Sequence, residues 1–126
     1  MSYPNIKMLY TIKDGIKYAF KDDLYHSADL PAVVHPSGHK EWWLEGQRHR
    51  SKGPAVVFED GGQEWWKYGE KHRIDGPAVS YANGHKEWWI YGKLHRLEGP
   101  AVEYNNGKKE WWEDGEFLYA YDDKNE

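Results

Sequence analysis

The 126-residue sequence contains no cysteine. A disulfide framework and a thiolate metal site are therefore both excluded. No apolar run approaches the ~18 residues of a membrane-spanning helix, and the first ten residues, MSYPNIKMLY, lack the apolar core of a signal peptide. We therefore expect a cytoplasmic protein that has no membrane partner.

An excess of positive charge is missing as well. The formal net charge is -4, although 30% of the residues are charged. Long nucleic acids and anionic lipids attract proteins mainly through lysine and arginine. The charge balance therefore argues against duplex nucleic acid as a partner.

Aliphatic side chains are too few for a conventional two-layer globule, and the mean hydropathy is -1.02. Aromatic residues are plentiful instead, with 8 Trp and 10 Tyr against 3 Phe. Rings that carry a polar atom suit surfaces with one apolar and one wet side. This composition favours a thin repeat sheet.

The chain repeats with a period of 23 residues, in the pattern GPAV-x4-G-x2-EWW-x2-G-x2-HR. Such a period indicates one supersecondary unit stacked on copies of itself. We predict one repeat domain over residues 1–126, with an acidic tail that frays at its end. Its parts are a degenerate repeat (5–27), three full repeats (28–50, 51–73, 74–96), a capping repeat (97–119) and the tail (120–126).

Each repeat has two glycine turns and no helical pattern. The loop Pro36-Ser37-Gly38 is typical of a three-residue hairpin with a bulge, and Glu45-Gly46 is typical of a two-residue hairpin. Gly or Pro recurs every few residues, which disfavours helices. The predicted fold is all-β: an open single-layer antiparallel meander of about five stacked hairpins and about ten short strands.

The turn lengths predict a register. Around Glu45-Gly46, Trp43 should face Arg48, Trp42 should face His49, and Glu41 should face Arg50. The same rule pairs Glu64 with Arg73 and Glu87 with Arg96. Across the other turn, Ala32 should face Trp42.

Several stretches resemble the MORN repeat family. They are Glu87-Trp88-Trp89-Ile90-Tyr91-Gly92-Lys93-Leu94-His95-Arg96, Gly99, and Tyr104-Asn105-Asn106-Gly107-Lys108. The resemblance covers about residues 5–119, although Arg50, Arg73 and Arg96 stand where the family usually has Gly, and the double Trp replaces a Tyr-x-Gly-x-aromatic pattern. This variant is similar to tandem-repeat proteins of bacteriophages, large DNA viruses and some bacteria.

The resemblance implies a single-layer antiparallel sheet that serves as a scaffold, protein-binding surface or dimerisation element. It also implies an accessory protein that binds a host protein, such as an inhibitor of host defence, and then acts in the host cytoplasm. The departures from the family pattern argue against its lipid-binding role.

The Trp pairs are the main candidate binding residues. Side chains alternate across a strand, so the two rings of each pair should lie on opposite faces. A single-layer sheet has no second layer to cover its other face. We therefore expect one Trp ladder to be exposed. The first Trp ladder is Trp42, Trp65, Trp88 and Trp111, and the second Trp ladder is Trp43, Trp66, Trp89 and Trp112.

Polar residues repeat beside the Trp residues. The arginine ladder is Arg50, Arg73 and Arg96, and the histidine ladder is His26, His49, His72 and His95. Successive ladder histidines should lie ~9.5 Å apart, too far to share one metal ion. We expect them to donate to a neighbouring strand or to stack on Trp. His35, His39 and His85 are expected to be solvated turn residues, and no metal or cofactor is predicted.

Catalysis is not expected. The glutamate ladder (Glu41, Glu64, Glu87, Glu110) offers similar carboxylates, whereas glycoside hydrolysis needs two in different environments. The sequence has no G-x-S-x-G motif, no Walker loop and no Cys nucleophile.

The sequence therefore predicts a non-catalytic module that binds a protein partner. One alternative is a small-ligand binder that holds a nucleotide signal or carbohydrate on the Trp and Arg ladders. Another is a self-assembling structural element, since an open meander leaves two edges that could build a homodimer, as could a Trp face.

Overall fold

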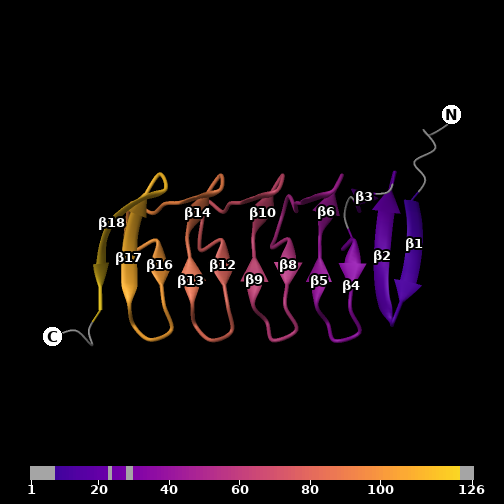
Figure 1. The fold of residues 1–126 in the computed structure, drawn as a ribbon, viewed down its shortest axis with the longest axis horizontal. Coiled ribbons are helices and arrows are strands. Elements are labelled where there is room, and N and C mark those ends of the chain that lie inside the picture. Colours follow the sequence, from indigo (N-terminus) through magenta and orange to yellow (C-terminus); the bar gives the residue numbers. More distant parts are fainter. Residues whose placement is uncertain (1–7, 23, 28–29, 123–126) are drawn as a thin grey trace.

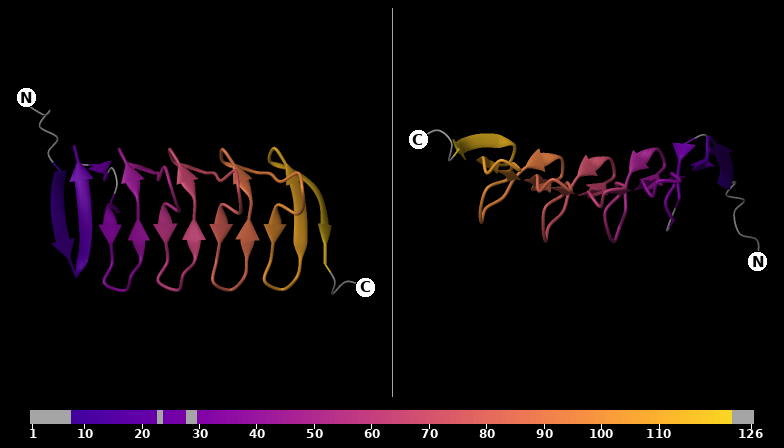
Figure 2. Two further views of the ribbon diagram at one scale, coloured as in Figure 1. Left: turned by 180° about the vertical axis from the view of Figure 1, so that it is seen from behind. Right: turned by 90° about the horizontal axis from the view of Figure 1, so that it is seen from below.

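The strands stand side by side in one long row, with the first and the last strand at opposite ends (Figure 1). The computed structural model describes residues 8–22, 24–27 and 30–122, and these residues form strands and turns without a helix. The views of Figure 2 show that the row does not close on itself. The predicted all-β, open antiparallel sheet is confirmed.

The described residues form one 12-stranded antiparallel sheet and three separate two-stranded hairpins. The sheet contains β1 (Met8–Lys13), β2 (Ile16–Lys21), β3 (Leu24–Tyr25), β4 (Val33–Val34), β5 (Lys40–Glu41), β8 (Val56–Val57), β9 (Gln63–Glu64), β12 (Val79–Ser80), β13 (Lys86–Glu87), β16 (Val102–Glu103), β17 (Lys109–Glu113) and β18 (Glu116–Tyr121). The hairpins are β6 (Trp43–Leu44) with β7 (Gln47–Arg48), β10 (Trp66–Lys67) with β11 (Glu70–Lys71), and β14 (Trp89–Ile90) with β15 (Lys93–Leu94).

The first turn of each full repeat is the predicted three-residue loop. In the first full repeat the His35 amide donates to the His39 carbonyl at 2.9 Å, and the Gly38 amide donates to the His35 carbonyl at 3.1 Å. Gly38 has a φ of 104°, which a side chain would strain. The same pair of bonds closes the loops after Phe58, Tyr81 and Tyr104.

The second turn is the predicted two-residue hairpin. Glu45 and Gly46 have φ values of 49° and 80°, so both central residues are left-handed, as a type I′ turn requires. Trp43 faces Arg48, as predicted, and Leu44 faces Gln47. The twist of this turn matches the twist of the strands that it joins.

The strand predicted to run through Glu-Trp-Trp is interrupted at the first Trp in the three full repeats. The Trp42 amide donates to the Ala55 carbonyl of the next repeat at 2.7 Å, whereas the Trp42 carbonyl accepts from the His49 amide at 3.1 Å. Trp42 therefore joins the sheet to the hairpin. Because each full repeat breaks here, the described chain has 18 strands rather than about ten.

The predicted Glu–Arg pairs are wrong. Glu64 lies between Val56 and Val79 in the sheet, not opposite Arg73. The pairing of strands beside the second turn stops at Trp65. Arg73 lies beyond this point, and its amide donates to the Trp89 carbonyl of the next repeat at 3.1 Å.

The predicted Ala32–Trp42 pair is also not formed as expected. The Ala32 amide donates to the Glu41 carbonyl at 2.8 Å, one position off the register of β4 and β5. The alanine that bonds Trp42 is Ala55 of the following repeat.

The core is a thin line of alanine and valine that runs along the sheet. The alanines Ala32, Ala55, Ala78 and Ala101 are 0–1% exposed, and the valines Val33, Val56, Val79 and Val102 are 0–4% exposed. On one face, each valine lies opposite a ladder glutamate in the neighbouring strands. Repetition therefore builds a continuous core without a second layer.

Longer hairpins finish both ends of the row. β1 and β2 pair over six positions across the turn Asp14-Gly15. At the other end, β17 runs without a break through both Trp residues, with a bulge between Trp111 and Trp112. In this way β18 takes the place that the next repeat would occupy.

The position of β18 corrects the predicted tail. Ala120 and Tyr121 pair with Glu110 and Lys109, so the residues expected to fray are partly strand. Residues 123–126 lie outside the described part of the chain, as do residues 5–7 of the degenerate repeat and Asp23, expected at its second turn.

Val79→Ala should lower the free energy of unfolding by about 2 kcal/mol, because it removes two buried carbon atoms and leaves a cavity. Val79 is 0% exposed. Urea denaturation followed by Trp fluorescence measures the change.

The matched control is Ile74→Ala, since Ile74 is 82% exposed. It should change stability by less than about 0.5 kcal/mol. Equal losses in the two variants would contradict the location of the core.

Candidate functional site

The arginine ladder covers the first Trp ladder. In each full repeat the guanidinium carbon lies over the ring of the Trp eight residues earlier. Such a cation–π contact contributes about 0.5–2 kcal/mol. The distances to the ring centroid are 3.8 Å for Arg50 on Trp42, 4.0 Å for Arg73 on Trp65 and 3.8 Å for Arg96 on Trp88.

The motif H-R-x-x-G-P holds this arginine in place. Arg73 Nη1 donates to the Pro77 carbonyl at 3.2 Å, and Arg73 Nε donates to Asp75 at 3.0 Å. A Cβ atom at Gly76 would lie 2.9 Å from the Arg73 guanidinium carbon, so glycine leaves the space for the cap. The predicted Arg–Glu pairing is replaced by this local contact.

The second Trp ladder leans over the opposite face and binds the glutamate ladder. The indole N–H of each Trp donates to the glutamate two residues earlier. The distances are 2.9 Å for Trp43 to Glu41, 2.9 Å for Trp66 to Glu64, 2.7 Å for Trp89 to Glu87 and 2.9 Å for Trp112 to Glu110. Glu64 is buried and the other three glutamates are half-buried, so these bonds satisfy carboxylates that have limited access to water.

Two cations lie between rings of the second Trp ladder. The Arg48 guanidinium carbon is 5.2 Å from the ring centroids of both Trp43 and Trp66. Lys71 Nζ is 5.6 Å from the Trp66 centroid and 4.9 Å from the Trp89 centroid. Sequence reasoning missed this bridging role, because Leu94 stands at the equivalent position in the next repeat.

Neither Trp ladder is exposed as the sequence predicted. Trp42 is 7% exposed, and the other seven Trp residues are half-buried. Arginine covers three rings of the first ladder, and Tyr119 stacks on the fourth, Trp111. Glutamate, Arg48 and Lys71 contact rings of the second ladder. Binding at these residues stays a prediction, but the rings do not form an open aromatic surface.

The histidine ladder connects successive repeats. Nδ1 of each ring accepts from the backbone amide 19 residues later. The distances are 3.1 Å for His26 from Glu45, 3.0 Å for His49 from Tyr68, 2.9 Å for His72 from Tyr91 and 3.0 Å for His95 from Asp114. The rings therefore accept rather than donate, which corrects the prediction.

Two of these histidines, His49 and His72, stack on tyrosine rather than on Trp. The ring centroids are 4.1 Å apart for His49 and Tyr68 and 4.0 Å apart for His72 and Tyr91. Burial lowers the pKa of His49 and of His72, and the Lys67 charge lowers both further. An uncharged ring keeps Nδ1 free to accept.

The glutamate ladder has a second set of partners near the first turns. Glu64 accepts from the Tyr81 hydroxyl at 2.8 Å, and Glu110 accepts from the Tyr104 hydroxyl at 3.0 Å. Burial and the hydrogen bond to Glu64 raise the pKa of Tyr81 to about 12, so the hydroxyl keeps its proton.

The turn histidines are not solvated as expected. His39 Nε2 lies 2.9 Å from Glu41 Oε2, and His85 Nε2 lies 2.7 Å from Glu87 Oε2. His35, His39 and His85 are all half-buried.

Large apolar side chains gather at the two ends of the row instead. On β1, Leu9, Tyr10 and Ile12 are 56–72% exposed. On β18 the exposed residues are Phe117 (53%), Leu118 (47%), Tyr119 (55%) and Tyr121 (52%). Among the described residues, β1 pairs only with β2 and β18 only with β17, so each keeps one free edge.

An open hollow of about 580 Å³ lies between two successive arginine loops. The hollow is lined by Arg73, Arg96 and Trp88, and by Ile74 and Leu97 from the two loops. Ile74 and Leu97 are 82% and 74% exposed. A second open hollow, of about 360 Å³, lies between the loops of Arg50 and Arg73 beside Trp65.

The chain matches no protein-family model and no curated protein sequence. Residues 8–22, 24–27 and 30–122 include no helix that is long and apolar enough to cross a membrane.

Arg73→Ala should lower the free energy of unfolding by about 1–2 kcal/mol, because it removes the cation–π contact and the bond to Pro77. Arg73→Lys should recover only part of the loss, since an ammonium cannot cover the ring and reach the carbonyl as a planar guanidinium does. Urea denaturation measures both.

The control for this series is Lys52→Ala, a change at an exposed residue of the equivalent loop. A loss with Arg73→Ala no larger than with Lys52→Ala would contradict the capping role.

The protein should lose stability as the pH falls through about 6.5. The pKa values of His49 and His72 are lowered in the folded state, so the unfolded chain takes up protons first. The stabilisation that the two uncharged histidines contribute is complete above the unfolded-state pKa. It disappears as the pH falls through their folded-state pKa values. Urea denaturation at pH 5 to 8 measures it.

The double variant His49→Asn/His72→Asn keeps an oxygen acceptor but does not titrate. Its unfolding free energy should vary less between pH 7 and 5 than that of the wild type. An unchanged slope would show that these two rings do not set the pH dependence.

Proposed function

We propose that this protein is a non-catalytic, MORN-like repeat module that binds a protein partner, and that it does so through the edge strand β18. The observation that carries the proposal is the combination of a free strand edge with exposed apolar side chains. Four residues of β18 are each about half exposed, and β18 pairs on one side only within the described chain. An exposed patch of this kind is typical of a protein interface.

A free edge recognises another chain through main-chain hydrogen bonds. Soluble proteins usually protect such an edge with lysine, proline or a very short strand. β18 is six residues long and carries Phe117, Leu118, Tyr119 and Tyr121. An extended segment of a partner could add to the sheet here, and the alternating side chains would give specificity.

The aromatic residues of β18 are held in place before any partner arrives. Tyr119 stacks on Trp111 with centroids 4.6 Å apart and an interplanar angle of 15°. Phe117 meets Trp112 edge to face at 5.4 Å. Rings that are already ordered lose little conformational entropy on binding, which favours affinity.

The environment of the glutamate ladder supports a non-catalytic function. Each carboxylate accepts from an indole N–H at nearly the same distance. Acid–base catalysis by two carboxylates needs environments that separate their pKa values. Repeated, similarly bonded glutamates do not offer that difference.

A small-ligand binder is the second candidate, and the hollow between Arg73 and Arg96 favours it. Two guanidinium groups beside Trp88 suit a small anion with a planar ring. Both guanidinium groups are already bonded to proline carbonyls, which leaves fewer donors for such a ligand.

The resemblance to phage and viral repeat proteins makes a host protein the first class of partner to test. A component of host defence is included in that class. This choice of partner rests on the resemblance and on no contact within the structure.

The double variant Leu118→Lys/Tyr121→Lys should abolish partner binding, because two ammonium groups on the edge strand oppose strand addition. Both side chains are about half exposed, so the fold should tolerate the change. Affinity capture compares the proteins bound by the wild type and by the variant, and sedimentation gives their oligomeric state.

The matched control is Ile12→Lys on the opposite edge, where Ile12 is 72% exposed. It should leave partner binding unchanged. Proteins captured equally by the wild type and both variants would contradict the role of β18. Self-association that only the β18 variant removes would favour the self-assembling alternative, and Trp quenching by a nucleotide would favour the small-ligand candidate.

A further inference from the structure

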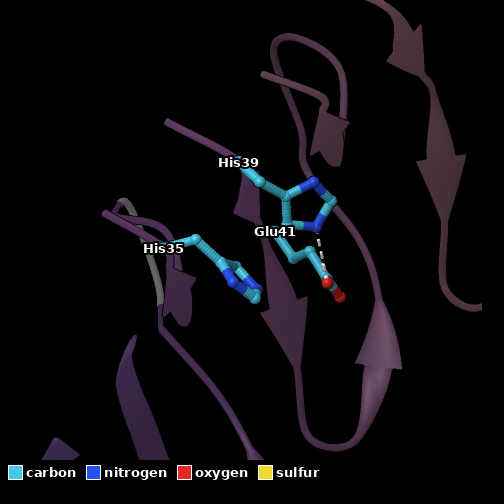
Figure 3. A group of neighbouring side chains, drawn as sticks. All are labelled: His35, His39 and Glu41. Atoms are coloured by element: carbon cyan, nitrogen blue, oxygen red, sulfur yellow. Dashed lines mark hydrogen bonds and ion pairs between the residues drawn. The ribbon is translucent and has the colours of Figure 1, made fainter. Parts of the chain in front are cut away.

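Three side chains with metal-binding atoms meet at the turn between β4 and β5. His35 and His39 flank the loop Pro36-Ser37-Gly38, and Glu41 lies two residues beyond His39. Figure 3 shows both imidazole rings and the carboxylate gathered on one side of this hairpin. All three residues are half-buried.

The distances are close to those of a metal site. One ligand atom from each residue lies within 4.8 Å of the others. His39 Nε2 is already 2.9 Å from Glu41 Oε2, and the two imidazole centroids are 4.8 Å apart. Bonds of about 2.0–2.1 Å in tetrahedral geometry place ligand atoms about 3.4 Å apart.

We propose that His35, His39 and Glu41 form a binding site for a divalent transition-metal ion such as Zn²⁺. Two imidazoles and one carboxylate are borderline ligands that favour zinc, nickel, cobalt or copper over calcium and magnesium. Three protein ligands leave a fourth position for water or for a group of another molecule.

The surroundings orient the ligands. The Trp43 indole donates to Glu41 Oε1 at 2.9 Å, and an ion would replace the direct contact of His39 Nε2 with Oε2. The backbone bond from His35 to His39, at 2.9 Å, fixes the two histidines opposite each other. Such outer contacts raise metal affinity, because they hold ligands in position before the ion arrives.

Other charged groups lie near the candidate site. Arg48 Nη2 lies 3.7 Å from Glu41 Oε1, the oxygen that also accepts from Trp43, and not at Oε2. The carboxylates of Glu59 and Asp60 line the same open hollow of about 460 Å³.

Only one repeat carries the complete set. The positions equivalent to His35 and His39 hold Phe58 and Gly62, then Tyr81 and His85, then Tyr104 and Lys108. The other repeats therefore show which side chains the fold accepts at the positions of His35 and His39 in place of a metal ligand. The histidine ladder does not compete, because each of its Nδ1 atoms accepts from a backbone amide.

Isothermal titration of the untagged full chain with ZnCl₂ at pH 7.5 tests the site. We expect one Zn²⁺ per chain, and affinity lower by at least about tenfold in His35→Phe, which copies the next repeat. Mg²⁺ should not bind. NMR of the histidine rings should show that one equivalent of Zn²⁺ shifts the signals of His35 and His39.

The matched control is His85→Lys, which copies the residue of the last repeat. It removes the His85–Glu87 pair. That repeat has Tyr81 at the position of His35, so its set of ligands is incomplete. The zinc affinity of this variant should equal that of the wild type. His35→Tyr, which copies the third repeat, serves if His35→Phe does not fold.

The proposal is overturned if the wild type does not bind Zn²⁺ at about 100 µM. This concentration is about tenfold above the Kd of a site of moderate affinity, so such a site would be nearly filled. It is also overturned if removal of His35 leaves affinity unchanged, or if the NMR shifts fall on the histidine ladder. The site is far from β18 in the row of strands, so its failure and that of the edge-binding proposal are independent (Figure 1).

Discussion

A sheet with a single layer has no partner layer, and each repeat must cover both of its own faces with its own side chains. Two contacts achieve this. The arginine of H-R-x-x-G-P covers the first Trp on one face, and the glutamate of E-W-W binds the second Trp on the other. The thin alanine and valine core stays dry because these large residues close over it. The spacing of H-R-x-x-G-P follows from this need, since the Pro carbonyl holds the arginine that covers the ring and the Gly leaves space for it.

The contacts that cover the sheet also leave the Trp ladders less available for binding. Rings that already hold guanidinium, ammonium or carboxylate groups present little open surface. The features that remain free are those that repetition does not satisfy. One is the edge strand β18, which has no following repeat to pair with. Another is the turn of the first full repeat, where His35 stands at a position that holds Phe or Tyr in the three repeats that follow. Both proposed sites therefore lie where the chain departs from its repeat.

The fold could be predicted to the level of the turns because glycine positions and loop lengths are local signals. The two-residue turn Glu45-Gly46 and the pair Trp43–Arg48 depend on a few adjacent residues, and both are confirmed. The pairs beyond the junction, such as Glu64 with Arg73, could not be predicted in this way. A register extends from a turn only while the strand stays regular, and the strand breaks at Trp65, whose amide bonds Ala78 of the next repeat.

The sequence by itself determined the period, the all-β class, the turn types and the residues of the ladders, because these follow from local backbone preferences and from repetition. Only the tertiary structure decided what each ladder touches. The histidines accept from an amide 19 residues away, and Arg48 lies between rings of two repeats. It also decided that His35, His39 and Glu41 converge and that β18 replaces a missing repeat. Contacts between repeats depend on how the units stack, and a one-dimensional pattern does not contain that geometry.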